Sequence, residues 1–533
     1  MPRLPLPTSL SPEAENSGGE LARRLQRFTV PILLGMFCLC FLAGALRDAG
    51  RNVPWMDEVL AIWVARLPTY QQVWSALFHG AETSPPTYDL LLHTLISAGG
   101  ASYLLLRLPS ILAILVSGLC LFALLRRYLD VGAAAYGMVF SLLGIQATYA
   151  IQARPYALVV ACFMGAVLSW DRVEESDRRF WRVCTMAALL AFASSLHFYA
   201  ILFVPCMGAM ELLWWVVNRR IRISVWLGLL LAGLSTFAWL PLMRLYSSMN
   251  AVDALSVDYY AKPTPAALVH YYAQLAFWDK KQILFFAATL CVVVAVSGLG
   301  RTRLVAGPGS ITSSESPAGS PLNYYVITFC IFLFPLLVFV FALLVTKTFN
   351  LRYVLAGSLG FSCLIAYALG MASAFRWSAG LILLSACPFA LMSTPYPSGG
   401  LAEHVNVVKK VPQPYPIVIG EGRVYFELEE AVPGDFKSRL VYVNTPPRAV
   451  NPDITNEHLL QRWHQIRPDL NIENADDFFA RNPRFYLFHT ASSTDVITKW
   501  LIERHLIVRP VSWHDYGGEY GAGWLFEAEA PQE

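Results

Sequence analysis

The sequence predicts a polytopic α-helical membrane protein of about eleven spans, followed by a soluble α/β domain at the C-terminal end. The chain of 533 residues is 56% hydrophobic and 14% charged, whereas soluble chains carry about 25% charged residues. Apolar runs of roughly 16 to 24 residues recur from about residue 29 to residue 395, close to the length that crosses a bilayer. After residue 395, charged residues, proline and asparagine become frequent. These observations divide the chain into a membrane part and a soluble part.

The first 28 residues are polar and end in Arg23, Arg24 and Arg27, directly before the first apolar run. We interpret 1–28 as a cytoplasmic segment and the run after it as a signal anchor, because further spans follow. The membrane part then occupies 29–395. Its spans are expected near 29–46, 103–125, 132–149, 155–170, 183–197, 198–217, 224–243, 283–299, 325–345, 354–373 and 378–394.

The segment 88–98 decides the topology of the remaining spans. It is apolar but short, and it contains Asp89 and His93, so we expect a re-entrant or interfacial helix. The preceding residues 57–79, which include Trp63, are expected to form a helix that lies in the membrane interface, where tryptophan is favoured.

Loops rich in arginine alternate with loops that hold few cations. If 88–98 does not span, all the arginine-rich loops fall on the same side as the N-terminus, and such loops face the cytoplasm. We therefore expect a multi-pass protein of the cell (inner) membrane with a cytoplasmic N-terminus and long outer loops at 47–102 and 244–282. The arginine-rich loops hold Arg126-Arg127, Arg172–Arg182, Arg219–Arg222, Arg301–Arg303 and Arg376.

The tail, 396–533, is expected to be an extracytoplasmic soluble domain. Short apolar strands are predicted at 415–420, 440–444 and 484–489. Helical spacing is found between and after them, at 421–430, 454–464 and 494–505. Strands interleaved with helices predict a small α/β domain. All ten cysteines lie in the apolar runs, so the tail has no disulfide framework.

Polar residues that interrupt apolar sequence collect on the predicted outer side. A carboxylate at the lip of a membrane is expensive to desolvate and usually has a function. A carboxylate that faces several cations suits activation of a hydroxyl group and stabilisation of a phosphate leaving group. The residues are Asp57, Glu58, Glu82, Arg107, Gln152, Arg154, Tyr156, His197, Tyr199, Lys347, Arg352 and Tyr353.

Several of these residues also have a structural alternative. Asp57 and Glu58 could cap an interfacial helix, Arg154 could extend to lipid headgroups, and Arg352 could anchor a span at the interface. His197 could be a satisfied structural histidine. The net charge of +3 is too small to indicate a nucleic-acid partner.

Several ordered motifs over residues 25–375 resemble the GT-C glycosyltransferases, in particular the protein O-mannosyltransferase and aminoarabinose transferase branch with its RgtA/B/C/D-like domain. The resemblance is specific for the class and not for a substrate. The motifs are Trp55-Met-Asp-Glu58, Pro85-Pro-Thr-Tyr88, Arg107-Leu-Pro-Ser110, Gln152-Ala-Arg-Pro-Tyr-Ala-Leu158, His197-Phe-Tyr-Ala-Ile-Leu202 and Arg352-Tyr353.

The resemblance implies transfer of a sugar from a polyprenyl-phosphate donor to a lipid, glycan or protein acceptor on the extracytoplasmic side, with inversion. It implies Asp57 as the catalytic base with Glu58 in support, and Arg154 and Arg352 as ligands of the donor phosphate. The remaining candidates for the substrate site are Glu82, Arg107, Tyr156, His197, Lys347 and Tyr353.

One motif departs from the family, because Gln152 stands where many relatives have glutamate. Some branches of the family require a divalent cation and others do not. No strong ligand cluster is found in the sequence, so a cation is left open.

Two other functions fit the composition. A transporter or flippase of a lipid-linked saccharide would carry ionisable residues in the middle of its spans and often shows paired halves. Here the charges lie mostly at the ends of the spans, and the sequence has no internal repeat. A non-catalytic scaffold with an outer binding domain would not need the polar residues of the outer lip.

Overall fold

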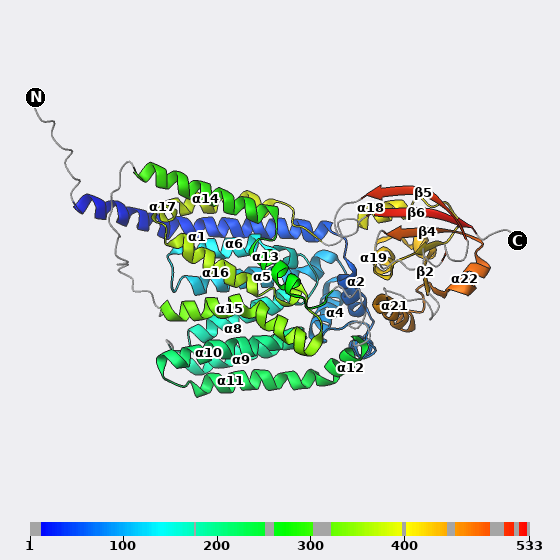
Figure 1. Ribbon diagram of the computed structural model, residues 1–533, viewed down its shortest axis with the longest axis horizontal. Helices are drawn as coiled ribbons and strands as arrows, with labels where there is room; N and C mark the ends of the chain where they lie inside the picture. Colours follow the sequence, from blue (N-terminus) through cyan, green and yellow to red (C-terminus); the bar gives the residue numbers. More distant parts are fainter. Residues whose placement is uncertain are drawn as a thin grey trace, which may run out of the picture.

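The computed structural model describes residues 12–174, 177–250, 261–301, 321–396, 401–444, 454–490, 501, 506–515 and 522–529. A bundle of long helices forms most of the molecule, and a mixed helix and sheet region lies at one end of it (Figure 1). Short helices of the first outer loop, among them α2 and α4, lie between these two regions (Figure 1).

The bundle is built from helices that the apolar runs of the sequence form. Figure 1 shows most of them side by side along the long axis of the molecule. They are α1 (Pro12–Arg51), α5 (Tyr103–Leu125), α6 (Val131–Leu143), α7 (Ile145–Ala150), α8 (Tyr156–Asp171), α9 (Arg179–Leu196), η1 (Phe198–Leu202), α10 (Phe203–Asn218), α11 (Ile223–Ser235), η2 (Thr236–Trp239), α12 (Leu240–Asn250), α13 (Pro265–Ala276), α14 (Lys280–Arg301), α15 (Pro321–Phe341), η4 (Ala342–Thr346), η5 (Leu351–Tyr353), α16 (Gly357–Gly370) and α17 (Ser373–Leu391).

Helical structure occupies every segment that the sequence predicts to span. Within the described residues, six helical stretches are long and apolar enough to cross a membrane: Phe28–Arg51, Tyr103–Leu125, Phe198–Asn218, Ile223–Ser248, Lys280–Ser297 and Pro321–Thr346. Four shorter apolar helices accompany them, at Val131–Leu143, Tyr156–Asp171, Gly357–Gly370 and Trp377–Leu391. The expected span 132–149 is divided at Gly144 into α6 and α7.

Small residues let the helices of the bundle approach closely. A Cβ atom at Gly360 of α16 would lie 2.8 Å from the backbone nitrogen of Phe332 in α15. No side chain fits between the two backbones at that point. This packing is typical of helices in membranes, where close backbone contact replaces the hydrophobic driving force of water.

The first outer loop forms three helices, α2 (Met56–Ala65), α3 (Tyr70–Phe78) and α4 (Thr87–Gly99). The predicted helix at 88–98 is thus present as α4. The expectation of a single helix over 57–79 was wrong. The chain turns at Pro68, which cannot continue a helix, and the capping box of Thr69 and Gln72 starts α3.

Among the described residues after the bundle, five helices combine with one sheet. The helices are α18 (Leu401–Val408), α19 (Gly422–Ala431), α20 (Gly434–Lys437), α21 (Ile454–Ile466) and α22 (Ala475–Arg481). The strands are β1 (Ile417–Ile419), β2 (Leu440–Asn444), β3 (Ile472–Asn474), β4 (Arg484–Thr490), β5 (Ile507–Asp515) and β6 (Ala522–Glu529). Strands form at all three segments predicted from the sequence, whereas β3, β5 and β6 were missed.

The strand order is β3-β2-β1-β4-β6-β5. The first four strands are parallel, with Ile417 of β1 opposite Leu440 of β2 and Tyr486 of β4. Strands β6 and β5 extend the sheet in the antiparallel direction. Hydrophobic residues of β1, β2 and β4 are buried, as expected of central parallel strands covered on both faces.

The first outer loop and the C-terminal region share one hydrophobic core. Val59, Trp63 and Leu77 of the loop belong to the same buried cluster as Phe426 and Trp463 of the C-terminal region. Trp63 is 3% exposed, so its predicted place in the membrane interface was wrong. The interface with the C-terminal region covers it instead.

Some sequence predictions lie outside the described residues. The cytoplasmic segment 1–28 is described only from residue 12, and the outer loop 244–282 lacks a description of 251–260. Nearly all of the helix expected at 494–505 also lies outside the described residues.

Candidate active site

Asp57 and Glu58 lie in the first turn of α2, directly after the N-cap residue Trp55. Successive residues of a helix point about 100° apart around its axis, so the two carboxylates leave α2 in different directions. Negative charge is also favourable here, because the unpaired N–H groups at the start of a helix carry partial positive charge. The sequence pair therefore separates into two different environments.

Asp57 forms an ion pair with Arg352. Arg352 belongs to the short helix η5, which Asn350 begins by accepting a hydrogen bond from the Arg352 backbone nitrogen at 3.3 Å. The side chains of Asp57 and Arg352 are 18% and 16% exposed. Residues almost 300 positions apart thus meet at a place that solvent and a ligand can reach.

Glu58 is buried, and Arg107 of α5 binds it with two parallel hydrogen bonds of 2.9 Å. The side chains of Glu58 and Arg107 are 0% and 1% exposed. Arg107 also donates to the carbonyl oxygens of Ala49 and Asn52, at 2.6 and 2.7 Å. The backbone nitrogen of Ala153 donates to Glu58 at 2.5 Å. This pair fastens α1, α2, α5 and the segment before α8 to one another.

Arg154 connects Glu82 to the backbone of Asp57. Its Nη1 atom forms an ion pair with Glu82 and donates to the backbone carbonyl oxygen of Asp57 at 2.7 Å. Ser84 donates a further hydrogen bond to Glu82 at 3.1 Å. The guanidinium group of Arg154 lies 5.7 Å from the centre of the Tyr156 ring. Arg154 thus touches the residue that carries the exposed carboxylate.

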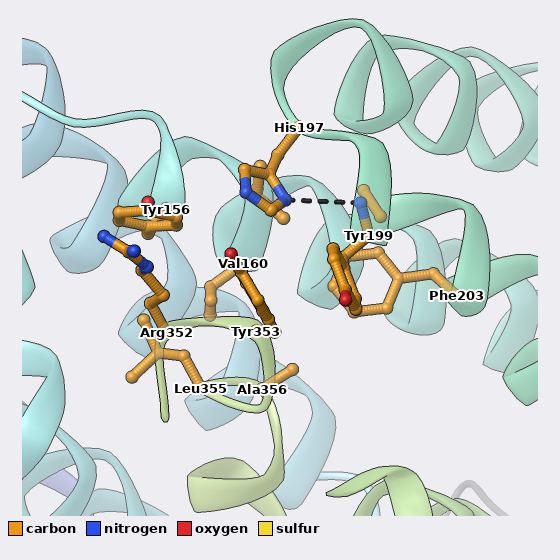
Figure 2. Close-up of a pocket in the computed structure, with 11 residues that line it drawn as sticks. Tyr156, Val160, His197, Tyr199, Phe203, Arg352, Tyr353, Leu355 and Ala356 are labelled. Atoms are coloured by element: carbon orange, nitrogen blue, oxygen red, sulfur yellow. Dashed lines mark hydrogen bonds between the residues drawn. The ribbon is translucent and has the colours of Figure 1, made fainter. Parts of the chain in front are cut away.

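A small cavity opens beside Arg352 (Figure 2). Figure 2 shows the rings of Tyr156, His197, Tyr199 and Tyr353 around it. The rings of Tyr199 and Tyr353 stack with centres 4.0 Å apart, and His197 lies 5.3 Å from both Tyr156 and Tyr353. The cavity has a volume of about 20 Å³, which holds little more than one water molecule.

Hydrogen bonds of Tyr199 hold the aromatic wall of the cavity, which Tyr156, His197, Tyr199 and Tyr353 form. The hydroxyl group of Tyr199 donates to the carbonyl oxygen of Thr348 at 2.7 Å. The backbone nitrogen of Tyr199 donates to Nδ1 of His197 at 3.3 Å (Figure 2). A ligand that enters must therefore move Arg352 or displace part of this wall.

The structure brings most of the predicted site residues together, but it does not bring in Lys347. Lys347 is exposed at the end of η4, and its Nζ atom bonds the carbonyl oxygen of Leu343 on the same helix. It does not line the cavity beside Arg352.

Gln152 lies in the segment of Arg154 and is 2% exposed. Its carbonyl oxygen accepts a hydrogen bond of 2.9 Å from the Arg154 backbone.

Two residues near the site were not among the predicted site residues. Tyr149 packs edge-on against Tyr156, with ring centres 5.6 Å apart. Asp89 of α4 is fully buried, and its carboxyl oxygens make no hydrogen bond within the described residues. Burial and the nearby Glu82 carboxylate raise the pKa of Asp89 well above its usual range. The signal in the sequence was an acidic residue within the short apolar run.

Within the part of the chain that the structure describes, three or more side chains of His, Cys, Asp or Glu do not gather in one place. Asp57 and Glu82 are each engaged by an arginine. The residues present therefore suit electrostatic binding of an anion by guanidinium groups.

No protein-family model matches the chain, and no curated protein matches it in sequence. Solved structures do match its fold. ArnT from Cupriavidus metallidurans in the apo state has a TM-score of 0.50 and 11% identity, over 93% of this chain and 97% of ArnT. ArnT bound to undecaprenyl phosphate has a TM-score of 0.49, again with 11% identity over 93% and 97% of the two chains.

The oligosaccharyltransferase of Archaeoglobus fulgidus, in complex with Zn and sulfate, has a TM-score of 0.44 and 10% identity. That match covers 92% of this chain and 72% of the oligosaccharyltransferase. ArnT and this enzyme are GT-C glycosyltransferases. At such low identity the likeness to apo ArnT establishes the fold, as the sequence motifs predicted. The chain is an integral membrane protein with the GT-C fold.

Proposed function

We propose that the chain is a membrane glycosyltransferase that moves a sugar from a polyprenyl-phosphate donor to an acceptor, with Asp57 as the catalytic base. The observation that carries the proposal is the ion pair of Asp57 with Arg352, the residue that lines the cavity. Both groups are partly exposed there, and they lie at the end of the helix bundle next to the C-terminal region (Figure 1). The carboxylate suits the proton that the acceptor releases, and the guanidinium group suits the negative charge that develops on the leaving phosphate.

The transfer needs one bond to form and one to break. The acceptor hydroxyl oxygen attacks the anomeric carbon, and the bond from that carbon to the phosphate oxygen breaks. Asp57 accepts the proton of the acceptor, and the polyprenyl phosphate leaves with the bonding electrons. Arg352 stabilises the charge that develops on the phosphate. A single displacement of this kind inverts the anomeric configuration.

Arg352 cannot bind a donor phosphate fully while it holds Asp57. A phosphate that binds Arg352 through two N–H groups competes with the Asp57 carboxylate and frees it to act as a base. The small volume of the cavity supports this order of events, because a sugar phosphate fits only after Arg352 or part of the aromatic wall moves. Donor binding and activation of the base are then one event.

The other candidate residues take supporting parts in this proposal. Arg154 is the second ligand of the donor phosphate, and Glu82 holds it in place until the donor binds. His197, Tyr156 and Tyr353 line the sugar side of the cavity. Glu58 and Arg107 support the site by their buried pairing and do not contact the donor. Lys347 reaches a substrate only from the exposed rim.

The donor class and the orientation belong to the same proposal. ArnT has been solved with undecaprenyl phosphate bound, and a polyprenyl phosphate is the donor carrier proposed here. Asp57 and the C-terminal region lie at the same end of the bundle (Figure 1). We place this end on the extracytoplasmic side of the inner membrane, because the arginine-rich loops then face the cytoplasm.

The proposal is tested in membranes that contain the wild-type chain, Asp57→Asn or the control Asp435→Asn, which makes the same change on an exposed carboxylate of the C-terminal region. Radiolabelled polyprenyl-phosphate sugars are offered, and the label is followed into lipid, glycan and protein fractions. Transfer by the wild type and the control, with none by Asp57→Asn, supports the proposal and names the acceptor class. Full transfer by Asp57→Asn refutes Asp57 as the base.

The same membranes separate this function from transport and scaffolding. If the inserted wild-type protein transfers no label from any donor, the glycosyltransferase proposal fails. Movement of an intact labelled lipid between the leaflets would then identify a flippase.

A further inference from the structure

The C-terminal region contacts the backbone of the first outer loop next to Asp57. Oε1 of Glu427 in α19 accepts a hydrogen bond of 2.9 Å from the backbone nitrogen of Met56. Met56 is the first residue of α2, and Asp57 is the second. Glu427 is 0% exposed, so this bond is protected from water.

Glu427 acts as an N-terminal cap of α2, although it lies in a distant part of the sequence. The N-cap residue of α2 is Trp55, whose side chain makes no capping hydrogen bond. Helices usually satisfy their first N–H groups with a Ser, Thr, Asp or Asn at this position. Here a glutamate 371 residues away supplies the acceptor, and its negative charge suits the start of the helix.

A second contact lies next to the other carboxylate of the loop. The indole Nε1 of Trp463 in α21 donates to the carbonyl oxygen of Ala81 at 3.1 Å. Ala81 directly precedes Glu82, which pairs with Arg154. Trp463 is 0% exposed. Asp57 and Glu82 therefore each follow a residue whose backbone is bonded to the C-terminal region.

The far end of α2 is also held by α19. Glu430 accepts hydrogen bonds from Trp63 at 3.0 Å, Arg66 at 2.8 Å and Tyr103 at 2.7 Å. The ring of Trp63 packs edge-on against Trp463, with centres 5.2 Å apart. The residues of α19 are therefore bonded to both ends of α2.

We propose that Glu427 and Trp463 are positioning residues that set the places of Asp57 and Glu82 through the backbone of the first outer loop. This inference rests on the proposed function for its effect on transfer. The C-terminal region is then a part of the catalytic apparatus that never touches the reacting atoms. Small displacements of a reacting group lower rates strongly, so these two contacts affect the chemical step more than donor binding.

The test compares Glu427→Met, which removes the acceptor, with Glu427→Gln, which keeps an oxygen that can accept from Met56. Glu473→Gln is the control, because Glu473 in β3 pairs with Arg481 of α22, away from the first outer loop. In the full-length protein we expect Glu427→Met to lower kcat per folded molecule about tenfold or more, with a small change in KM for the donor. Glu427→Gln should restore most of the rate.

Trp463→Phe tests the second contact, because it removes the indole N–H and keeps an aromatic ring in the core. A fall in kcat with an unchanged melting temperature is expected. A purely structural role would lower the amount of folded protein and leave the rate per folded molecule unchanged. That result, or a Glu427→Met variant with wild-type kcat, overturns the inference.

Amide hydrogen exchange gives a readout that does not depend on activity. Exchange in the first turn of α2, residues 56–60, should accelerate in Glu427→Met and remain at the wild-type rate in Glu473→Gln. Unchanged exchange in Glu427→Met refutes the positioning role even if the protein is active. Accelerated exchange in Glu427→Met, in the case that the wild type itself transfers no sugar, refutes the proposed function and retains the positioning of α2.

Discussion

Asp57 and Glu58 are neighbours in the sequence, and both form an ion pair with an arginine, yet the two pairs differ in every other respect. The Asp57–Arg352 pair is 18% and 16% exposed, whereas the Glu58–Arg107 pair is 0% and 1% exposed. Arg107 makes two parallel bonds to Glu58 and further bonds to backbone carbonyl groups. The buried pair has no room for a substrate, whereas Arg352 of the partly exposed pair lines a cavity.

The difference shows how one sequence motif can hold both a reactive group and its support. A buried ion pair must keep its partners, because a single buried charge is expensive. An exposed pair exchanges its partner for water or for a ligand at little cost. We therefore expect substitutions at Asp57 and Arg352 to change activity, and substitutions at Glu58 and Arg107 to change stability.

The largest effect is expected from Asp57→Asn. Loss of the proton acceptor should lower the transfer rate per folded molecule by about 10² to 10⁴-fold, while the melting temperature of the purified protein stays close to that of the wild type. Transfer assays and thermal unfolding of the same preparation check both statements. If Asp57→Asn is inactive because it is unfolded, the expected difference between the two pairs in activity and stability is wrong.

Glu58→Gln tests the other half of the comparison, the stability that the buried pair provides. Removal of one partner from a buried pair costs about 3–5 kcal/mol, so the yield of folded protein and its melting temperature should fall. The double variant Glu58→Leu with Arg107→Met should recover part of this stability, because it leaves no unpaired charge. Recovery will be partial, since Arg107 also serves the carbonyl groups of Ala49 and Asn52. Equal stability of the single and double variants would contradict the prediction.

Arg352→Lys should have a smaller effect on transfer. Lysine keeps the positive charge but loses the planar fork that binds a phosphate through two N–H groups. Loss of one charged hydrogen bond, about 1.5 kcal/mol or more, predicts a fall of about tenfold in kcat/KM for the donor. The control is Arg484→Lys, at the exposed first residue of β4, which should retain wild-type kinetics. An Arg352→Lys variant with wild-type kcat/KM would argue against Arg352 as a phosphate ligand.

The smallest effect concerns a third kind of carboxylate, Glu429, which is buried but loosely paired. Lys437 and Arg467 approach it only to 3.9 and 3.8 Å. Burial raises the pKa of Glu429 from 4.5 to about 7. The folded state then binds more protons than the unfolded state between pH 4.5 and 7, so stability falls as the pH rises through this range and is level above it.

Glu429→Gln removes this titration. The melting temperature of the wild type, relative to that of Glu429→Gln, should therefore decline from pH 5 to pH 7.5. Parallel curves for the two proteins would show that the carboxyl group does not titrate in this range.

Arginines elsewhere in the bundle show a limit of sequence reasoning. Arg127 and Arg222 belong to loops that the sequence places in the cytoplasm by their positive charge. Both are instead engaged in the structure, Arg127 with Asp171 and Arg222 with Glu211. Arg222 is 4% exposed on its side chain and lies 3.8 Å from the centre of the Trp214 ring. Part of the positive charge that predicts the topology is therefore neutralised by ion pairs with carboxylates of the bundle helices.

The positions of the long bundle helices followed from the sequence, because the length and hydropathy of an apolar run are local properties. The same holds for the central strands β1, β2 and β4, whose short apolar runs are visible directly. The breaks at Pro68 and Gly144 were not anticipated, nor were β5 and β6. Proline and glycine permit a break, but the neighbours that the chain packs against decide where it occurs.

The sequence alone also determined the residue types of the site, since carboxylates and arginines at the ends of apolar runs are rare and costly. Only the tertiary structure decided which carboxylate met which arginine. It joined Asp57 to Arg352, closed Glu58 against Arg107, and left Lys347 on an exposed helix end. It also buried Trp63 beneath the C-terminal region. The Asp57–Arg352 pair and the cover over Trp63 depend on contacts between residues hundreds of positions apart, and Glu58 meets Arg107 across 49 positions. The spacing of residues along a chain does not encode such contacts.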